Sequence, residues 1–514
     1  MKFYTKMVAI ATATILVFSC GKDVQPGLSF QPYKFSSLDE NGGDWKPIIL
    51  TSATQIAVET PAAPTDQAYK NEIEEVKTLS KSLSSDQQTA VKYWGGNCVA
   101  RWNEIANELM AKYNLPPAYD ASLGKYPVPD ATKPDQYPYF PFANPPYASR
   151  GYAHWSVANF DALIACWNAK RAFARKAPYT YDASISVNFI EKNDLPSYPS
   201  EDAVVAAVSR EVLTWLFPNE KQFLADKAEE AKNARLWAGV NVRSDIAAGD
   251  SLGRKVAALV IARGKTDKMG KANDQTIVHG IDSATVARGE MAWKSLESPA
   301  RPPMLPAFGN VVPWFIAATD VDNLVPAAPP STNSQQFKDE MQELREVQKN
   351  LTKDQRRIAN FWGDGPSTYT PPGHWNRTTC ELCVQNQLNP LRTARIFAYV
   401  NTAVGNAGII CWRTKYKYYN PRPSTFDPNF KTVLGIPNFP AYISGHSTFS
   451  AAAATVLGHF FPNEASRMDN LAQEASESRI YGGIHYRADC KIGLEVGKNV
   501  AQYSIDRAKT DGAE

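Results

Sequence analysis

The sequence predicts an all-α protein made of two tandem related helical bundles that pack about a pseudo-twofold axis. Apolar residues recur with a helical period, as on the face that Ile492, Val496 and Val500 share. Clean alternating patterns typical of strands are hard to find. Several motifs of the first half return in the same order in the second half, which indicates an internal duplication.

Length and composition set the limits of this prediction. The 514 residues leave room for two or three domains or one large double unit. With 44% hydrophobic and 21% charged residues, the chain should bury a core. Its 55 Lys and Arg nearly balance 52 Asp and Glu, and no dense basic run occurs, so nucleic acid is not an expected partner.

The N-terminus has the pattern of an export signal. Lys2 and Lys6 precede an apolar run over residues 7–18, which is short for a spanning helix. It is the only apolar stretch near membrane length, so a polytopic membrane protein is excluded. We therefore predict a lipoprotein signal peptide over residues 1–19.

The end of this signal resembles a bacterial lipobox. It reads Val-Phe-Ser-Cys, and Cys20 would then be lipidated and become the first residue of the mature chain. An ordinary secretory signal with an incidental cysteine is the alternative. We expect a flexible tether over residues 20–44, membrane attachment through the N-terminal lipid, and a place in the bacterial cell envelope as an outer-membrane lipoprotein.

The two predicted copies cover residues 45–299 and 300–514, joined near a Pro- and Ala-rich stretch over 302–330. In the second copy, residues 391–415 are predicted as a long buried helix and residues 449–461 as an Ala-rich helix. The motifs that pair the copies are Trp94-Gly95 with Trp362-Gly363, Trp102-Asn103 with Trp375-Asn376, Cys166-Trp167 with Cys411-Trp412, and Phe217-Pro218-Asn219-Glu220 with Phe461-Pro462-Asn463-Glu464.

Three cations of the second copy carry the first chemical argument. Lys415, Arg422 and Arg479 have no acidic run nearby to neutralise them. Three cations inside a helical bundle would be very costly without an anion. Because the planar forks of two arginines suit tetrahedral oxyanions, the cations point to an oxyanion site.

Two histidines and a helix start complete the pattern. Ser444, Gly445 and His446 precede the predicted Ala-rich helix, so backbone N–H groups and the helix dipole point at an anion. His485 and Asp489 are four residues apart and would be neighbours on a helix, where the carboxylate can hold Nδ1–H and present Nε2 as a nucleophile or ligand. His446 is then free to act as a general acid or base. Together these residues predict a site for phosphate or a phosphate-like oxyanion.

The clusters resemble the K-x6-RP, PSGH and SR-x5-H-x3-D signatures of the type 2 phosphatidic acid phosphatase and vanadium haloperoxidase superfamily, with Ile443 where the family usually has proline. The resemblance implies that His485 bears the phosphate or vanadate, that His446 is the acid–base and that Asp489 orients His485. It also implies an oxyanion bound by Lys415, Arg422, Ser444, Gly445 and Arg479.

The same pocket serves two reactions in this superfamily. One is the oxidation of halide by hydrogen peroxide at a histidine-bound vanadate cofactor, and the other is acid phosphatase hydrolysis of a phosphomonoester through a phosphohistidine. The surroundings of Trp412, Phe439 and His374 resemble those of haloperoxidases and favour that branch, although both aromatic residues could simply fill the core and His374 could have a structural or capping role. A protein that only captures phosphate is disfavoured, because both histidines and Asp489 are retained.

The first copy acts as an internal comparison. Lys170, Arg235 and Asp245 survive in it, and we expect the two cations to be relics or ion-pair partners of Asp202 and Asp245. Four aligned positions have lost the site chemistry: Ala177 for Arg422, Glu201 for Gly445, Asp202 for His446 and Asn241 for His485. We therefore predict that the first copy is a catalytically inactive scaffold.

Overall fold

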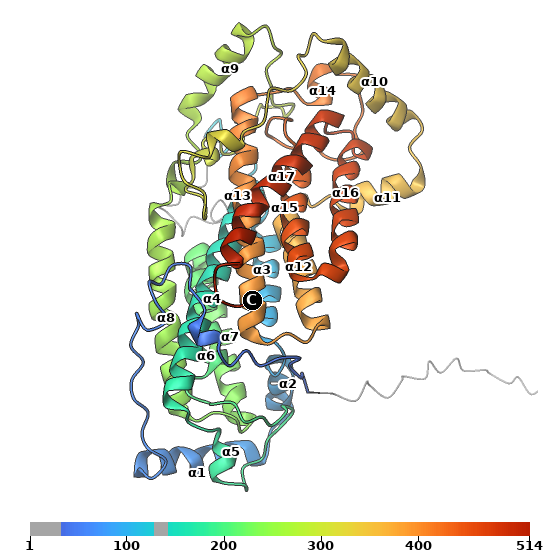
Figure 1. The fold of residues 1–514 in the computed structure, drawn as a ribbon. Coiled ribbons are helices and arrows are strands. Elements are labelled where there is room, and N and C mark those ends of the chain that lie inside the picture. The colour runs from blue at the N-terminus through green and yellow to red at the C-terminus, as the bar shows by residue number, and fades with distance from the viewer. Residues whose placement is uncertain (1–31, 128–141) are drawn as a thin grey trace, which may run out of the picture. The chain divides into compact units, whose positions relative to one another are not determined.

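The computed structural model describes residues 32–127 and 142–514, and this part of the chain is helical with no β-strand (Figure 1). The all-α prediction is thus confirmed. The predicted signal peptide and Cys20 lie outside the described residues. No helix in the described ranges is both long and apolar enough to cross a bilayer.

The helices fall into two groups along the chain, separated by a long connection over residues 288–334. The first half contains α1 (Gln67–Lys81), α2 (Ser85–Trp94), α3 (Cys98–Tyr113), α4 (Pro145–Phe173), α5 (Pro178–Tyr181), α6 (Glu201–Leu216), α7 (Lys221–Trp237), α8 (Arg243–Thr266) and α9 (Val278–Ala287). The second half contains α10 (Gln335–Lys349), α11 (Lys353–Phe361), α12 (Thr370–Gln385), α13 (Pro390–Tyr418), α14 (Pro423–Phe426), α15 (Gly445–Phe460), α16 (Ala465–Tyr481) and α17 (Arg487–Ala508).

Helices of the two halves correspond in order and length. Both α4 and α13 have 29 residues, α6 and α15 have 16, and α7 and α16 have 17. Asn144 and Asn389 cap the two longest helices, each by accepting a backbone N–H of the first turn. This correspondence supports the duplication as an interpretation, while the pseudo-twofold axis stays a prediction.

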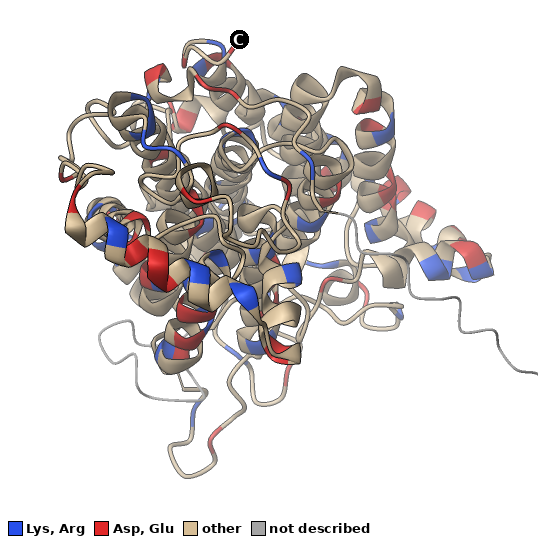
Figure 2. Ribbon diagram, turned by 90° about the horizontal axis from the view of Figure 1, so that it is seen from below, with Lys and Arg blue, Asp and Glu red and all other residues tan. Residues whose placement is uncertain are grey.

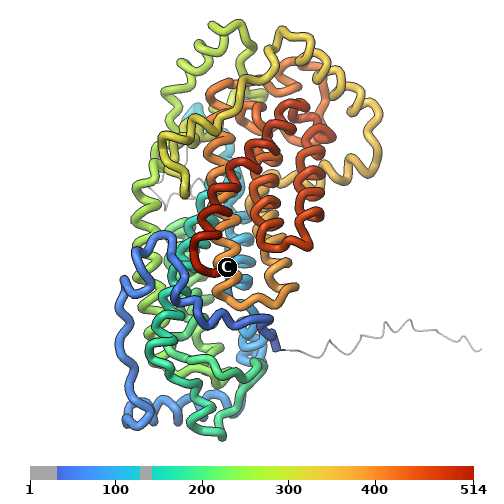
Figure 3. The backbone as a smooth tube through the Cα atoms, in the orientation of Figure 1, coloured from blue at the N-terminus to red at the C-terminus, as the bar shows by residue number. Residues whose placement is uncertain are grey.

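Helices α4 and α13 pack along one another in the middle of the described residues (Figures 1 and 3). Most of their residues are buried, so both helices are covered on nearly every side. Glycine permits the close contacts: a Cβ on Gly408 would lie 2.9 Å from the Phe449 ring. Helices α15, α16 and α17 then pack around α13 and one another, which brings the second-copy clusters together.

Two helix boundaries differ from the sequence prediction. The long buried helix predicted over 391–415 is α13, three residues longer at its C-terminal end. The Ala-rich helix predicted from residue 449 begins at Gly445, because the Ser444 side chain accepts the Ser447 N–H and caps α15. His446 therefore lies within the first turn of the helix and not ahead of it.

The described part of the predicted tether is held against the helices. The Tyr33 hydroxyl donates to the Leu388 carbonyl at 3.0 Å, and Arg392 pairs with Asp39. Residues 32–44 thus contact the start of α13, and the rest of the predicted tether lies outside the described residues. In Figure 2 basic and acidic positions alternate along the outer helices, in keeping with a net charge of +3.

A buried ion pair fixes the C-terminal end to α13. Asp511 accepts hydrogen bonds from Arg395 Nε and from the Tyr399 hydroxyl, both at 2.8 Å, and both partners of the ion pair are at most 1% exposed. We expect Asp511→Asn to lower the free energy of unfolding by about 3–5 kcal/mol, because the buried guanidinium then keeps only the exposed Glu514 carboxylate, at 3.4 Å, as an ionic partner. Urea denaturation would measure this change. The surface pair of Asp354 and Arg357 provides the control: Asp354→Asn should leave the midpoint in place, and equal losses in both variants would contradict the prediction.

Candidate active site

Residues from several helices and loops of both halves line a cavity of about 530 Å³. Four of the predicted residues line it: Gly445, His446, Arg479 and His485. The other four are buried behind this wall: Lys415, Arg422, Ser444 and Asp489. The sequence clusters, far apart along the chain, thus lie in one place.

His485 is held as a neutral imidazole whose Nε2 lone pair points toward Arg422. Its Nδ1 lies 2.8 Å from Asp489 Oδ2, and Arg422 Nη1 lies 3.0 Å from Nε2. Burial, followed by the charges of Arg422, Lys415 and Arg479, lowers the pKa of His485 well below its ordinary value. Because Arg422 can only donate, Nε2 must accept, and the ring proton belongs on Nδ1.

The prediction that His485 and Asp489 share a helix is wrong. Helix α17 begins at Arg487, so His485 lies in the turn that precedes it. Asp489 stands in the first turn of α17, accepts the Tyr486 N–H at 3.2 Å and reaches back to His485. Burial raises the pKa of the Asp489 carboxyl, against the charges of Lys415 and Arg422. The predicted orientation of the imidazole is present, but a helix cap and not a helix face produces it.

Arg422 has a free donor at the site. Its Nε donates to the Phe439 carbonyl at 3.0 Å and its Nη1 to the Ile484 carbonyl at 2.7 Å. Its Nη2 is buried without a hydrogen-bond partner among the described residues. Burial lowers the pKa of Arg422 to about 10, yet the group stays charged at neutral pH. A buried, unsatisfied guanidinium N–H is costly unless an acceptor arrives.

Arg479 is the cation that faces the cavity directly. It is 1% exposed, its Nε donates to the Ser478 hydroxyl at 2.9 Å, and its Nη2 donates to the Trp362 carbonyl. Burial lowers the pKa of its guanidinium to about 10. Two fixed donors orient the fork and leave its charge at the cavity wall.

Lys415 differs from the direct anion ligand that the sequence implies. Its ammonium donates to three backbone carbonyls at 2.6–2.9 Å, those of Pro440, Ala441 and Ile443. All three N–H groups are thereby used, and Lys415 does not line the cavity. Burial lowers the pKa of this ammonium. In this arrangement Lys415 orders the loop before α15 and places its charge behind the cavity wall.

The N-terminus of α15 opens onto the cavity. The Ser444 N–H donates to the Asp489 carbonyl at 2.9 Å, which ties the start of α15 to α17. A Cβ on Gly445 would meet only Phe449 and Trp412, at 3.7 and 3.9 Å, so the bare backbone faces the cavity. The unpaired N–H groups and the dipole of a helix start attract an anion.

Trp412 and Phe439 form an aromatic part of the cavity wall. Their ring centroids are 5.0 Å apart, and Lys415 Nζ lies 5.1 Å from the Phe439 ring. Both rings therefore pack against neighbouring side chains and also line the cavity. A packing role and a place at the site are thus compatible for these two residues.

Sequence reasoning missed Asp364. This residue lines the cavity, and its Oδ2 lies 3.5 Å from His446 Nε2. Burial raises the pKa of the Asp364 carboxyl, but His374 and His446 outweigh burial and hold that pKa well below its ordinary value. The one signal in the sequence was a difference between the copies, since Gly96 occupies the corresponding place after Trp94-Gly95.

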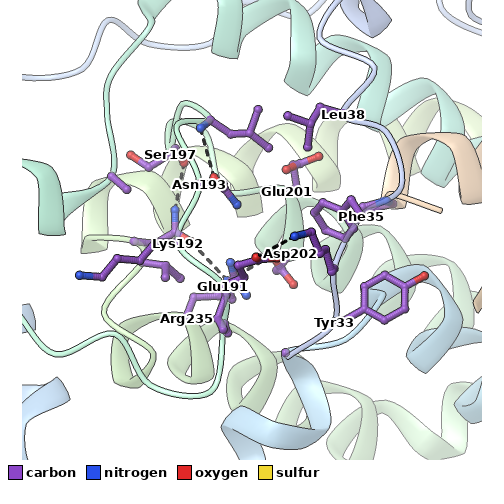
Figure 4. A pocket seen from close by; sticks show the side chains of 18 of the residues that line it. Tyr33, Phe35, Leu38, Glu191, Lys192, Asn193, Ser197, Glu201, Asp202 and Arg235 are labelled. Carbon is purple, nitrogen blue, oxygen red and sulfur yellow. Dashed lines mark hydrogen bonds and ion pairs between the residues drawn. The ribbon is translucent and has the colours of Figure 1, made fainter. Parts of the chain in front are cut away.

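The first copy forms a pocket of about 360 Å³ in which Lys170 and Arg235 lie beside carboxylates (Figure 4). Figure 4 shows Glu201, Asp202 and Arg235 facing the same space. Arg235 Nε lies 3.2 Å from Asp202 Oδ2, and Lys170 Nζ lies 3.6 Å from Glu201 Oε2. The expected pairing with Asp202 is thus present.

The expected ion pair between these cations and Asp245 is not present. Its carboxylate pairs with Arg175, two residues before the aligned position Ala177. Arg175 therefore supplies a guanidinium near the place that Arg422 has in the second copy, but its charge is compensated there by Asp245. Glu201 and Asp202 thus compensate the two first-copy cations, Lys170 and Arg235, that align with Lys415 and Arg479.

Known proteins resemble this chain in sequence and in fold. A family model described as "VCPO second helical-bundle domain" matches residues 464–511. The vanadium chloroperoxidase of Curvularia inaequalis is 27% identical over 162 residues, which is 24% of this chain. The match spans only 26% of that relative's length.

Solved structures share the fold. A bacterial vanadium-dependent iodoperoxidase superposes with a TM-score of 0.55 at 19% identity, covering 87% of this chain and 98% of that one. A bacterial vanadium-dependent chloroperoxidase in its apo form has a TM-score of 0.51 at 12% identity, covering 75% of this chain and 99% of that one. The three kinds of match together support the phosphatidic acid phosphatase and vanadium haloperoxidase superfamily.

The duplication offers a matched test of anion binding. We expect Arg479→Gln to weaken the binding of orthovanadate or phosphate by roughly 10–100-fold, because a buried cation at the cavity is lost. The equivalent first-copy change, Arg235→Gln, should leave binding unchanged, because Asp202 already neutralises that side chain. Isothermal titration would measure both affinities and the stoichiometry. Two anion sites per chain, or equal losses in the two variants, would contradict the assignment of the site to the second copy.

Proposed function

We propose, from the superfamily that the matches support, that the chain is a vanadium-dependent haloperoxidase-like enzyme that oxidises halide with hydrogen peroxide. One observation carries this proposal: the lone pair on Nε2 of His485 stands among three buried cations, while Nδ1 is tied to Asp489. Such an imidazole can bind the vanadium of a vanadate ion, and the cations can bind or balance its oxygens.

The residues present fit vanadate. The cations outnumber Asp489 and Asp364, the carboxylates whose charges act on them, so a bound oxyanion would relieve an excess of positive charge. The unpartnered Nη2 of Arg422 and the helix start at Gly445 offer donors. Bound vanadate would supply the activation of hydrogen peroxide on which halide oxidation depends.

The side chains around the cavity bind and orient the reacting groups and transfer protons. Asp489 fixes the His485 tautomer, and Arg422 and Arg479 hold negative oxygens in place with fixed donors. Lys415 adds charge and orders the loop that leads to the helix start. His446, at the cavity wall, takes a proton from the peroxide and returns one to the oxygen that leaves. The products are hypohalous acid and water, with one proton consumed in each turnover.

An acid phosphatase of the same superfamily would use the same residues. The lone pair of His485 would attack phosphorus, and His446 would protonate the leaving oxygen. We favour the haloperoxidase because the curated relative and the structural neighbours are named as vanadium haloperoxidases.

Activity of the vanadate-loaded full chain tests the proposal. With hydrogen peroxide and bromide or iodide, it should halogenate a dimedone reporter. His485→Ala should abolish this activity, because the ligand to vanadium is lost, and Asp489→Asn should lower kcat by roughly 10–100-fold, since Asp489 orients and does not react. His459→Ala is the matched control, because His459 contacts Glu514 away from the site.

A different outcome would assign the alternative. Vigorous hydrolysis of p-nitrophenyl phosphate that vanadate inhibits, together with no halogenation, would establish a phosphatase and overturn the haloperoxidase proposal.

We also propose that the protein is attached to the membrane of the bacterial envelope by lipid on Cys20. The lipobox-like run that ends at this cysteine supports the proposal. Cys20→Ser should move the expressed protein from the membrane fraction to the soluble fraction, as measured by immunoblot after ultracentrifugation. Retention of the variant in the membrane fraction would contradict lipid attachment at this residue.

A further inference from the structure

We propose that Asp364 and His374 are positioning residues for His446, forming a His–Asp–His chain in the wall between the active-site cavity and a second cavity. The inference deepens the proposed function and rests on it for the acid–base role of His446. Its geometric basis lies in three side chains from three different places: the loop after α11, the first turn of α12 and the first turn of α15.

Two buried polar atoms without partners face one another in this chain. Asp364 Oδ2 and His446 Nε2 each lack a hydrogen-bond partner among the described residues, and they lie 3.5 Å apart. The Asp364 side chain is 5% exposed and that of His446 is 15% exposed. Since no other polar partner is at hand for either atom, a small closure that forms an Nε2–H to Oδ2 hydrogen bond would satisfy both.

The other carboxylate oxygen is held by His374. Its Nδ1 lies 3.2 Å from Asp364 Oδ1. The His374 ring stacks on Trp362, with centroids 4.3 Å apart and an interplanar angle of 16°. This stack fixes the imidazole, and the imidazole in turn fixes the rotation of the carboxylate, so Oδ2 stays directed at His446.

The chain divides two cavities. Asp364 lines the active-site cavity and also a second cavity of about 570 Å³, which His374 lines as well. Glu381 and Arg377, which line the second cavity too, have side chains that are 51% and 63% exposed, so this cavity reaches solvent. The supporting pair can thus be reached from the side opposite to the substrate.

This arrangement determines which nitrogen of His446 reacts. An imidazole has two nitrogens, and with Nε2–H directed at Asp364, Nδ1 is left for the reacting oxygen. The carboxylate also stabilises the imidazolium that forms when Nδ1 takes a proton. Around His446, Arg479 and His374 disfavour that charge and Asp364 favours it, while burial dominates and lowers the pKa of His446 to about 4. His446 in turn disfavours a charge on His485.

The same short segment also supports a cation of the site. The Trp362 carbonyl accepts from Arg479 Nη2, two residues before Asp364. The short segment after α11 therefore contacts both Arg479 and His446, two residues that line the cavity.

The duplication gives an independent observation. In the first copy, Gly96 follows the Trp94-Gly95 motif where Asp364 follows Trp362-Gly363, and Arg101 precedes Trp102-Asn103 where His374 precedes Trp375-Asn376. The residue aligned with His446 is Asp202. All three members of the chain are thus absent from the copy that lacks the acid–base histidine, as expected if they act as a unit.

Variants of the full-length protein test this proposal. Asp364→Asn keeps the shape but removes the charge, and His374→Phe keeps a ring on Trp362 but removes Nδ1. Glu381→Gln is the control, because Glu381 lines the second cavity and contacts Arg377 only at the surface. We expect kcat for halide oxidation to fall roughly 10–100-fold in Asp364→Asn and less in His374→Phe, with KM for hydrogen peroxide and vanadate affinity within about threefold of wild type.

A measurement without turnover separates this proposal from the proposed function. Histidine-labelled protein free of vanadate, with the His446 signal assigned by its loss in His446→Gln, reports the pKa of His446 by NMR. Because the carboxylate stabilises the imidazolium, Asp364→Asn should lower this pKa by about one pH unit or more. The result stands whether the chain proves to be a haloperoxidase or a phosphatase.

Two outcomes would overturn the proposal. One is an unchanged His446 titration in Asp364→Asn. The other is a loss of vanadate affinity as large as the loss in kcat, which would show that Asp364 acts through Arg479 and not through His446. The His374→Phe variant decides the matter should Asp364→Asn fail to fold: kcat equal to that of wild type would exclude a role for the chain.

Discussion

The burial of three cations around one imidazole is the constraint on which the rest of this site depends. Each cation donates hydrogen bonds to the backbone around it. Lys415 donates to three carbonyls of the loop before α15, and Arg422 donates to the carbonyls of Phe439 and Ile484. Arg479 donates to the Trp362 carbonyl at the end of α11. These bonds leave the positive charge in place while they fix the backbone around it. The loops therefore have a defined shape before any anion enters, which is the preorganisation that electrostatic catalysis requires.

The sequence contained most of the second-copy site because its residues lie in short motifs with fixed spacing. Convergence of Lys415, Arg422 and Arg479 follows from the cost of burying cations apart from an anion. What spacing could not show was local backbone geometry: the cap at Ser444 moves the start of α15, and the turn at His485 replaces the expected helical pairing with Asp489. Asp364 escaped notice because a lone acid in a loop has no periodic or motif signal, and the sequence around His374 could not show that this histidine would hold Asp364.

The two halves show that similar helices can present aligned cations with or without carboxylate partners. Matching helix lengths and caps place Lys170 and Arg235 where the second copy has Lys415 and Arg479, yet Glu201 and Asp202 convert that pocket into ion pairs. The first copy still contributes to the site through packing. Its helix α4 runs along α13, and Ser156 accepts a hydrogen bond from Asn401 at 2.8 Å in the buried contact between the two helices.

The position of Asp364 ahead of α12 has a consequence for how the protein can be divided. The three signature clusters all lie C-terminal to residue 414, and a fragment that began there would contain every residue of the family motifs. It would lack the carboxylate beside His446, the Trp362 carbonyl beside Arg479 and most of the buried helix that carries Lys415. The smallest unit able to assemble the site is therefore much larger than its motifs, and transplanting those motifs alone into another helical scaffold would carry over the ligands without their supports.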